Sequence, residues 1–270
     1  MKHRLASLGV IIPALSILFM MCSGEVVLES FWRDRDIVVD GTGSEWENTL
    51  TYIETANMAI SVCNDSEALY LAVVPWNQEA LVQVARSGCV FRFETEKANT
   101  GSYGIHFPFG DPPTAMAMMR NMTRTETVEQ IQSLSEHETT VELLDSKREV
   151  IARLALEEAA VSGIEVSLGE YNGRLLVEAK MPYRVDIEGN TYHIKGDAEQ
   201  LLVMSIETPR ENEDVRPDDQ TSSPPEFTDP YIRRNTGGTG ENTNPERTFF
   251  LPPLSLTMRV RLAQDPEPGQ

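Results

Sequence analysis

The side chains that most often do chemistry are present in this sequence, but their spacing is not that of a catalytic motif. The chain has no P-loop, no glycine-rich dinucleotide turn, no HExxH pair and no Gly-x-Ser-x-Gly nucleophile elbow. His106, His137 and His193 stand apart, without the spacing of metal ligands, and we interpret each as a solvated or hydrogen-bonded residue. A carboxylate pair for glycoside cleavage is defined in space and is not readable from sequence. The sequence therefore favours a protein that is not an enzyme.

The charge balance excludes one class of partner. Among 270 residues, 42 are Asp or Glu and 23 are Lys or Arg, so the formal net charge is −19. This charge repels phosphate backbones and offers no basic surface for counterion release, so we expect no nucleic-acid partner. Carboxylates scattered over a soluble surface explain the acidity.

The first residues have the layout of an export signal. In "MKHRLASLGVIIPALSILFMMCSG", Lys2, His3 and Arg4 precede an apolar run, which predicts a secretory signal over residues 1–24. Cleavage after Gly24 and lipid attachment at Cys22 remain equal alternatives. We expect an exported protein, periplasmic or at the cell surface, whose one contact with membrane would be a lipid on Cys22.

The two other cysteines are expected to remain unpaired. In "GCVFRFE", Cys89 shares a strand face with Phe91 and Phe93, whereas Cys63 lies opposite Ile60 and Val62 in its own strand. If both apolar faces point inward, the two sulfur atoms point to different sides of the sandwich. We therefore interpret them as a small buried hydrophobic residue and a free thiol.

The elements that must position any site are mostly strands. Apolar residues alternate with period two in short runs that end at turn residues. "NMAISVC" and "ALYLAVV" predict one hairpin, and "SGIEVSLGEYNGRLLVEAKMPY" predicts a second with Asn172-Gly173 as its turn. "CVFRFE", "YGIHFPF", "EQLLVMSIET" and "LSLTMRVRLA" predict further strands, with Pro108 at an edge or a strand end. The fold class is a mainly β, antiparallel β-sandwich of jelly-roll or immunoglobulin-like type.

Three segments depart from the strand pattern within a single domain at residues 25–263. A short helical insertion is expected around residues 114–160, with Thr127 or a neighbouring threonine as a cap and irregular Met-rich core filling. The apolar spacing of "KREVIARLALEEAA" permits either a helix or a strand, and we favour the helix. Residues 209–248 are too poor in apolar side chains to fold alone and predict a flexible loop before the final strand. Residues 264–270 predict a disordered tail.

The order of these motifs resembles a known family. "IVVDGTGSEW", "VCNDSEALYLAVV", "GCVFRFE", "YGIHFPFG" and "GIEVSLGEYNGRLLVEAKMPY" together look like the β-sandwich of family 9 carbohydrate-binding modules and their DOMON-like relatives, closest to divergent exported bacterial versions. The resemblance covers about residues 30–208 and resumes at residues 253–263. It implies a first strand at residues 37–39, a turn at Asp40-Gly41 and a structural role for Trp46 as an apolar plug.

The resemblance implies sugar binding by exposed aromatic rings with polar neighbours. Trp76 in "VVPWNQE" follows a strand end and has Asn77 beside it, so it is the best candidate for stacking on a pyranose. Tyr103 is a second candidate. Arg92 occupies the outward face where relatives often place an aromatic residue, and it could bond hydroxyl groups.

The resemblance also implies metal or haem in some relatives. Calcium needs six to eight oxygen ligands, and Asp40, Asp65 and Glu67, with Asn64, are acceptable donors, although turn formation explains the Asp and Asn residues as well. Haem would need a Met and a His, but no spacing ties His106 or His193 to a particular methionine. Calcium is thus the one cofactor expected, and haem is a minor alternative.

Two functional hypotheses emerge from these residues. The first is a non-catalytic, exported module that binds a polysaccharide or other glycan through loops around Trp76 and Tyr103. The second is a structural or assembly protein of the bacterial envelope that binds an envelope protein and lacks a sugar site. A solvent-facing aromatic platform would favour the first hypothesis, and a buried Trp76 the second.

Overall fold

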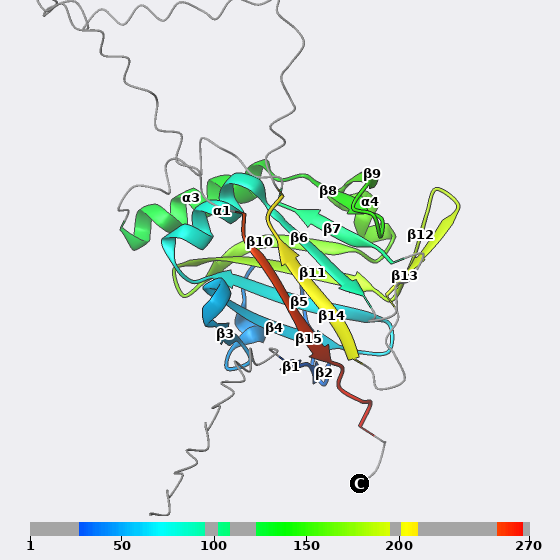
Figure 1. The fold of residues 1–270 in the computed structure, drawn as a ribbon. Coiled ribbons are helices and arrows are strands. Elements are labelled where there is room, and N and C mark those ends of the chain that lie inside the picture. The colour runs from blue at the N-terminus through cyan, green and yellow to red at the C-terminus, as the bar shows by residue number, and fades with distance from the viewer. Residues whose placement is uncertain (1–26, 95–101, 109–122, 195–200, 210–252, 267–270) are drawn as a thin grey trace, which may run out of the picture.

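The computed structural model describes residues 27–94, 102–108, 123–194, 201–209 and 253–266, and these residues form a β-sandwich (Figure 1). In this part of the chain, a seven-stranded sheet has the order β1-β15-β14-β6-β7-β8-β9. A second sheet has the order β10-β11-β5-β4-β2, with β3 also pairing with β4, and β12 and β13 form a separate hairpin. The fold class predicted from sequence is confirmed.

The strands of the seven-stranded sheet come from the two ends and the middle of the chain. Their bounds are β1 Val27–Glu29, β6 Cys89–Glu94, β7 Gly104–Phe107, β8 Thr140–Leu144, β9 Val150–Ala155, β14 Leu201–Glu207 and β15 Ser255–Arg261. Side chains alternate on β15: Leu256, Met258 and Val260 are buried in the core. β7 ends directly before Pro108, as a residue without a ladder donor requires.

The six-stranded sheet contains both predicted hairpins. Its strands are β2 Phe31–Trp32, β3 Thr51–Ile53, β4 Met58–Asn64, β5 Ala68–Pro75, β10 Glu165–Tyr171 and β11 Arg174–Pro182. β4 pairs antiparallel with β5, and β10 with β11. The turn between β10 and β11 places Asn172 at φ 53° and Gly173 at φ 76°, the left-handed pair that a two-residue hairpin needs.

Strands β4 and β5 are buried on both faces because a second apolar layer covers the sheet. One face packs against the seven-stranded sheet in the main core. The opposite face forms the outer cluster, whose buried members are Ile37, Trp46, Ala59, Cys63, Ala68, Tyr70, Ala72, Val74 and Leu176. Residues 31–50 supply this cover, which includes the 3-10 helix η1 (Ser44–Trp46). A second 3-10 helix, η2 (Glu54–Ala56), leads into β4.

Trp46 plugs the outer cluster, as predicted, but the expected first strand is not formed. The ring of Trp46 is fully buried and meets Phe31 edge-on, with ring centroids 6.1 Å apart. Residues 37–39 have no strand pairing; Ile37 instead packs its side chain into the outer cluster. Ile37 buries its side chain by packing on the outer face of the sheet, which needs no strand pairing, whereas Val38 stays exposed.

Helices close the ends of the sandwich. α1 (Gln78–Ser87) carries the chain from β5 to β6, and α3 (Arg124–His137) packs on β10 and β11 with Ile131 and Leu134 buried. α4 (Leu156–Val161) follows β9, and the β12–β13 hairpin (Arg184–Ile187 and Asn190–His193) extends from the body (Figure 1). Thr123 caps α3 in a reciprocal box with Glu126, in place of Thr127.

In "KREVIARLALEEAA" the favoured helix forms only in the second half, and the strand that the spacing also permitted forms in the first half. Residues Val150–Ala155 form β9 on the free edge of β8, and only Leu156–Val161 is helical. The β-branched residues Val150 and Ile151 suit an edge strand, and the Glu158 carboxylate accepts the Ala155 N–H where the helix begins. The predicted methionine filling, the loop at residues 209–248 and the leader at residues 1–24 lie outside the described residues, apart from residue 209.

Candidate functional site

Trp76 lies on the surface at the end of β5. Its side chain is 40% exposed, and among the aromatic residues of the described chain only Trp76 and Tyr52 are exposed. Its backbone N–H donates to the Asn57 carbonyl at 2.8 Å, which fixes the chain where β5 ends. The predicted exposure of Trp76 is therefore present, on a rigid strand end.

Tyr52 forms an aromatic pair with Trp76. Tyr52 lies on β3, is 46% exposed, and its ring centroid is 5.7 Å from that of Trp76 at an interplanar angle of 52°. Its hydroxyl donates to the Asn57 side-chain oxygen at 3.1 Å. Tyr52 was not identified from the sequence, because its exposure depends on β3 being the short edge strand beside β4.

Arg174 completes this platform from the β10–β11 hairpin. Its Nη1 donates to the Trp76 carbonyl at 2.5 Å, and its Cζ lies 4.3 Å from the centre of the Trp76 ring. The guanidinium is thus stacked on the indole in a cation–π contact. We call Tyr52, Trp76 and Arg174 the aromatic platform.

A cavity of about 230 Å³ lies beside the platform. Its lining is mostly polar, with Thr55, Ala56, Asn57, Asn77, Glu79, Ala80, Gln83, Pro253, Leu254 and Ser255. Asn57 joins the two features, since its carbonyl bonds Trp76, its side chain bonds Tyr52 and it lines the cavity. Amide and carboxylate groups next to exposed rings suit a ligand with one apolar face and many hydroxyl groups.

Asn77 has a structural role that its position in sequence only partly indicated. Its side-chain oxygen accepts from Ala80 N at 2.8 Å, so it is the N-cap of α1. The sequence pattern indicated a loop for Asn77 and Glu79, whereas α1 begins at Gln78. Because the cap uses the oxygen atom, the amide nitrogen of Asn77 is the atom that can bond a ligand in the cavity it lines.

The structure places Tyr103 and Arg92 away from the platform's solvent-facing surface. Tyr103 is fully buried and its hydroxyl donates to the Pro182 carbonyl at 2.7 Å, so its ring cannot stack on a sugar. Arg92 is 4% exposed; its guanidinium pairs with Glu94 and donates to the Ser146 carbonyl at 3.0 Å. Both assignments are corrected for the same reason: burial and internal partners remove these groups from any ligand in solvent.

The predicted calcium ligands are used in turns. Asp40 accepts from the backbone and hydroxyl of Thr42, and one Asp65 oxygen accepts from the backbone N–H groups of Glu67 and Ala68, each at 2.8 Å. Within the described ranges, no three His, Cys, Asp or Glu side chains are grouped to hold a metal ion. These residues therefore do not fit a calcium site together, and calcium binding stays a prediction without a ligand set.

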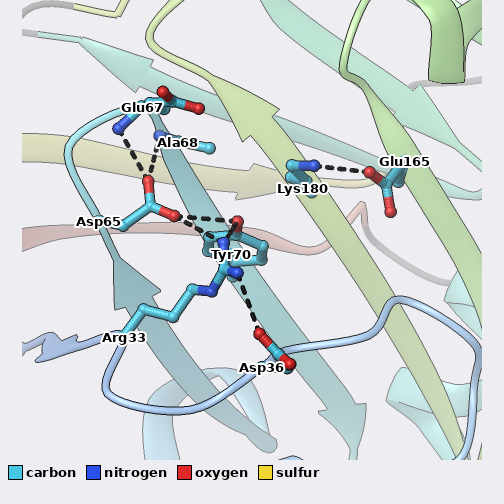
Figure 2. Close-up of polar contacts among 8 residues, drawn as sticks. All are labelled: Arg33, Asp36, Asp65, Glu67, Ala68, Tyr70, Glu165 and Lys180. Atoms are coloured by element: carbon cyan, nitrogen blue, oxygen red, sulfur yellow. Dashed lines mark hydrogen bonds and ion pairs between the residues drawn. The ribbon is translucent and has the colours of Figure 1, made fainter.

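Asp65 instead anchors the segment that crosses the outer face of the sheet (Figure 2). Arg33 Nη1 donates to Asp65 at 2.8 Å and to the Tyr70 hydroxyl at 2.5 Å, and Tyr70 donates to Asp65 at 3.1 Å. Burial acts to raise the pKa of Asp65, but the hydrogen bonds that its carboxylate accepts lower the pKa below its usual value. Burial raises the pKa of Tyr70 to about 12, so its proton stays in the network.

His106 belongs to a second hydrogen-bond network, whose members are structural partners. Its Nδ1 is 2.9 Å from the Glu142 carboxylate and its Nε2 is 2.9 Å from the Ser87 carbonyl. Arg153 also donates to Glu142. Burial acts to raise the pKa of Glu142, but Arg153 and His106 outweigh it and lower the pKa. His106 is thus a hydrogen-bonded structural residue, as its isolation in the sequence indicated.

Cys63 and Cys89 lie in different apolar clusters. Cys63 belongs to the outer cluster and Cys89 to the main core, and both are buried free thiols. This arrangement confirms the prediction from strand alternation. No helix of the described residues has the length and apolar content to cross a membrane.

No protein-family model matches the chain, and no curated protein matches it. Among solved structures, a family 9 carbohydrate-binding module from Caldicellulosiruptor kristjanssonii, solved in complex with glucose, aligns with 70% of this chain and 80% of its own. The TM-score is 0.29 and the identity is 8%. Similarity at this level shows nothing about a ligand, and any binding site has to be inferred from the platform and the cavity themselves.

Proposed function

We propose that this protein is a non-catalytic, exported carbohydrate-binding module whose ligand lies on the aromatic platform. The observation that carries the proposal is the exposed pair of Tyr52 and Trp76 beside a polar cavity. Neighbouring exposed rings rimmed by polar groups mark a candidate ligand surface, and the C–H face of a pyranose is a suitable partner for them.

The neighbouring polar groups fit the rest of such a ligand. Asn57, Asn77 and Glu79 present amide and carboxylate groups in the cavity, which suits hydroxyl groups that both donate and accept hydrogen bonds. A cavity of about 230 Å³ is below the usual range for a drug-sized ligand and suits one sugar ring at most. The platform would then support the neighbouring part of the glycan.

The proposal that the protein acts by binding rests on what the platform contains. Tyr52, Trp76 and Arg174 offer stacking and hydrogen bonds but no nucleophile and no pair of acid and base. Export is proposed from the basic and apolar leader at residues 1–24, which would place the module where polysaccharides are met.

The test is retention of residues 25–270 on a panel of insoluble polysaccharides and a glycan array. Trp76→Ala should weaken binding at least about tenfold, as loss of a central aromatic residue does in other interfaces. Tyr52→Ala should weaken it less. Val150→Ala is the matched control, because Val150 is an exposed apolar residue on β9 of the other sheet and should leave binding unchanged.

Two results would contradict the proposal. If the folded wild-type protein retains no glycan, the alternative role of the platform, docking of an envelope protein, is favoured. Trp, Tyr and Arg are also typical of protein interfaces. Glycan binding that survives Trp76→Ala would place the sugar elsewhere. Thermal unfolding of each variant shows that loss of binding is not loss of fold.

A further inference from the structure

Arg174 differs from most arginines of the described chain in having no carboxylate partner there. Six others form ion pairs with acidic side chains: Arg33, Arg92, Arg148, Arg153, Arg184 and Arg261. Arg174 is instead held by the ring and the carbonyl of Trp76. In a chain of net charge −19, with acids abundant, this cation has been left facing the candidate ligand surface.

The bonds of Arg174 leave one edge of its guanidinium available. Nη1 is committed to the Trp76 carbonyl, and in the described part of the chain Nε and Nη2 make no hydrogen bond. These two N–H groups point in parallel along one edge of the planar guanidinium, which is the geometry that bonds both oxygens of a carboxylate. Because stacking on Trp76 already fixes the plane, little side-chain freedom remains to be lost on binding.

The two acids nearest to Arg174 along the chain have other partners. Glu170 accepts from the Gly173 backbone N–H, and Glu178 accepts from Gly41 and Trp46. Glu79 lines the cavity. The site therefore has two parts: the Arg174 cation lies beside the Trp76 indole, and the cavity contains side-chain amides and the Glu79 carboxylate.

We propose that Arg174 selects an acidic sugar, a uronic acid residue whose carboxylate it bonds in a bidentate manner while the ring stacks on the platform. This inference rests on the proposed function and names its substrate class. Net charge limits the length of the ligand, because a long polyanion would be repelled by the rest of the surface. Repulsion is screened only beyond about 8 Å at physiological ionic strength, and a long polyanion lying on the protein would bring many carboxylates closer than that to surface acids. A short acidic oligosaccharide or a chain end avoids these contacts and is favoured.

The experiment compares short oligosaccharides that differ only at the carboxyl group. Oligogalacturonates, oligomannuronates and glucuronate-bearing xylo-oligosaccharides are titrated into residues 25–270 by calorimetry, each against its carboxyl-reduced neutral form. At least one acidic form should bind roughly 10- to 100-fold more tightly than its reduced form, the usual range for hydrogen bonds to charged groups. A sulfated oligosaccharide should gain less, because a sulfate ester spreads its single negative charge over three weakly basic oxygens, each a weaker acceptor than a carboxylate oxygen.

Variants assign this preference to Arg174. Arg174→Gln should bring the acidic and reduced forms to similar affinity, and Arg174→Lys should restore only part of the difference because it keeps the charge without the fork. Arg148→Gln is the matched control: Arg148 is also an arginine beside a hairpin turn, but its exposed side chain pairs with Glu207, so the variant should not affect the preference.

The outcomes separate this inference from the proposed function. Equal affinity for acidic and reduced forms in the wild type would overturn the acidic-sugar assignment and leave sugar binding intact. A preference that persists in Arg174→Gln, or that is larger for sulfate, would also overturn it. Binding of no saccharide on any panel would overturn the proposed function and this inference with it.

Discussion

The indole of Trp46 donates its Nε1–H to one oxygen of the Glu178 carboxylate at 2.6 Å, in a place that solvent does not reach. The other oxygen accepts the Gly41 backbone N–H at 2.5 Å. A single buried acid on β11 thus ties both ends of the segment from Gly41 to Trp46 to the sheet. These two hydrogen bonds to Glu178 explain how the polar segment from Gly41 to Trp46 can place a tryptophan in the apolar outer cluster.

Glu178 should make stability fall as the pH rises. Burial raises the pKa of Glu178 above its usual value of 4.5, even though both N–H groups act to lower it. A raised folded pKa means that the favourable contribution is complete below the unfolded value and is lost as the pH rises through the folded value. Urea unfolding at a series of pH values should show this loss in wild type and not in Glu178→Gln.

The same variant has a second, pH-independent cost. Glutamine presents an N–H to one of the two donors and should lower the free energy of unfolding by about 1–3 kcal/mol at neutral pH. If the stability difference between wild type and Glu178→Gln does not change with pH, the pKa of Glu178 is not raised in the folded state.

Asp65 should make the free energy of unfolding fall as the pH is lowered, the opposite of the effect of Glu178. Its pKa is lowered, so its contribution is present above the unfolded value of 3.8 and is lost as the pH falls through the folded value. Asp65→Asn should unfold at a lower urea concentration than wild type at pH 7, and the gap should narrow in acid. Asp36→Asn is the control, because Asp36 is almost fully exposed in its contact with Arg33. An equal effect of both variants would contradict the anchoring role of Asp65.

The sequence predicted the elements whose signal is local. Alternation and the Asn172-Gly173 turn were sufficient for the hairpins, and the face of each cysteine followed from the same alternation. Residues 37–39 do not form the predicted strand, because a short apolar run can pair as a strand in a sheet or pack its side chains on the face of a sheet, and its sequence is the same in both cases. The start of the helix at Leu156 is not readable from local spacing, because it depends on the Glu158 contact to Ala155 N–H and on β9 pairing with the free edge of β8.

The site was predictable only in part. Trp76 could be found because it follows a strand end, but Tyr52 and Arg174 come from other strands and meet it only through pairing with β4 and β5. Tyr103 and Arg92 carried the right chemistry, yet burial depends on neighbours distant in sequence. Residue type predicts what a side chain can bond, whereas exposure decides whether it meets a ligand.

Asn77 allows the cap and the ligand contact to be separated. Asn77→Asp keeps the oxygen that caps α1, so thermal stability should stay near wild type, but it removes the amide donor and should weaken glycan binding. Asn77→Ala removes both and should cost about 1 kcal/mol of stability as well. Calorimetric titration with the best glycan, alongside thermal unfolding, checks this. Unchanged affinity in Asn77→Asp would exclude the amide from the site.

The two buried thiols should resist labelling. Burial raises the pKa of Cys63 and of Cys89 to about 12, so almost no thiolate is present near neutral pH. In residues 25–270, a thiol reagent should react with neither cysteine in the folded protein and with both in concentrated guanidinium chloride. Fast reaction of either thiol in the native state would show that its cluster opens more readily than the packing indicates.

Gly169 should be far less tolerant of a methyl group than Gly189. A Cβ on Gly169 would lie 1.8 Å from the Gly41 carbonyl oxygen, and that carbonyl accepts the Glu170 N–H at 3.1 Å. Gly189, in the β12–β13 turn, has φ +80° but nothing within 4 Å of an added Cβ. Gly189→Ala therefore carries only a left-handed backbone cost of about 1–2 kcal/mol, whereas Gly169→Ala must displace backbone and should cost about 3 kcal/mol or more.

The readout that separates these two glycines is the environment of Trp46. Gly41 can move away from Gly169→Ala only by straining its bond to Glu178, which also holds the Trp46 indole. Gly169→Ala should therefore shift tryptophan emission toward longer wavelength in the folded state, and Gly189→Ala should leave it unchanged. Equal unfolding free energies, or an unchanged spectrum in Gly169→Ala, would mean that the segment over the sheet is held by its apolar packing alone.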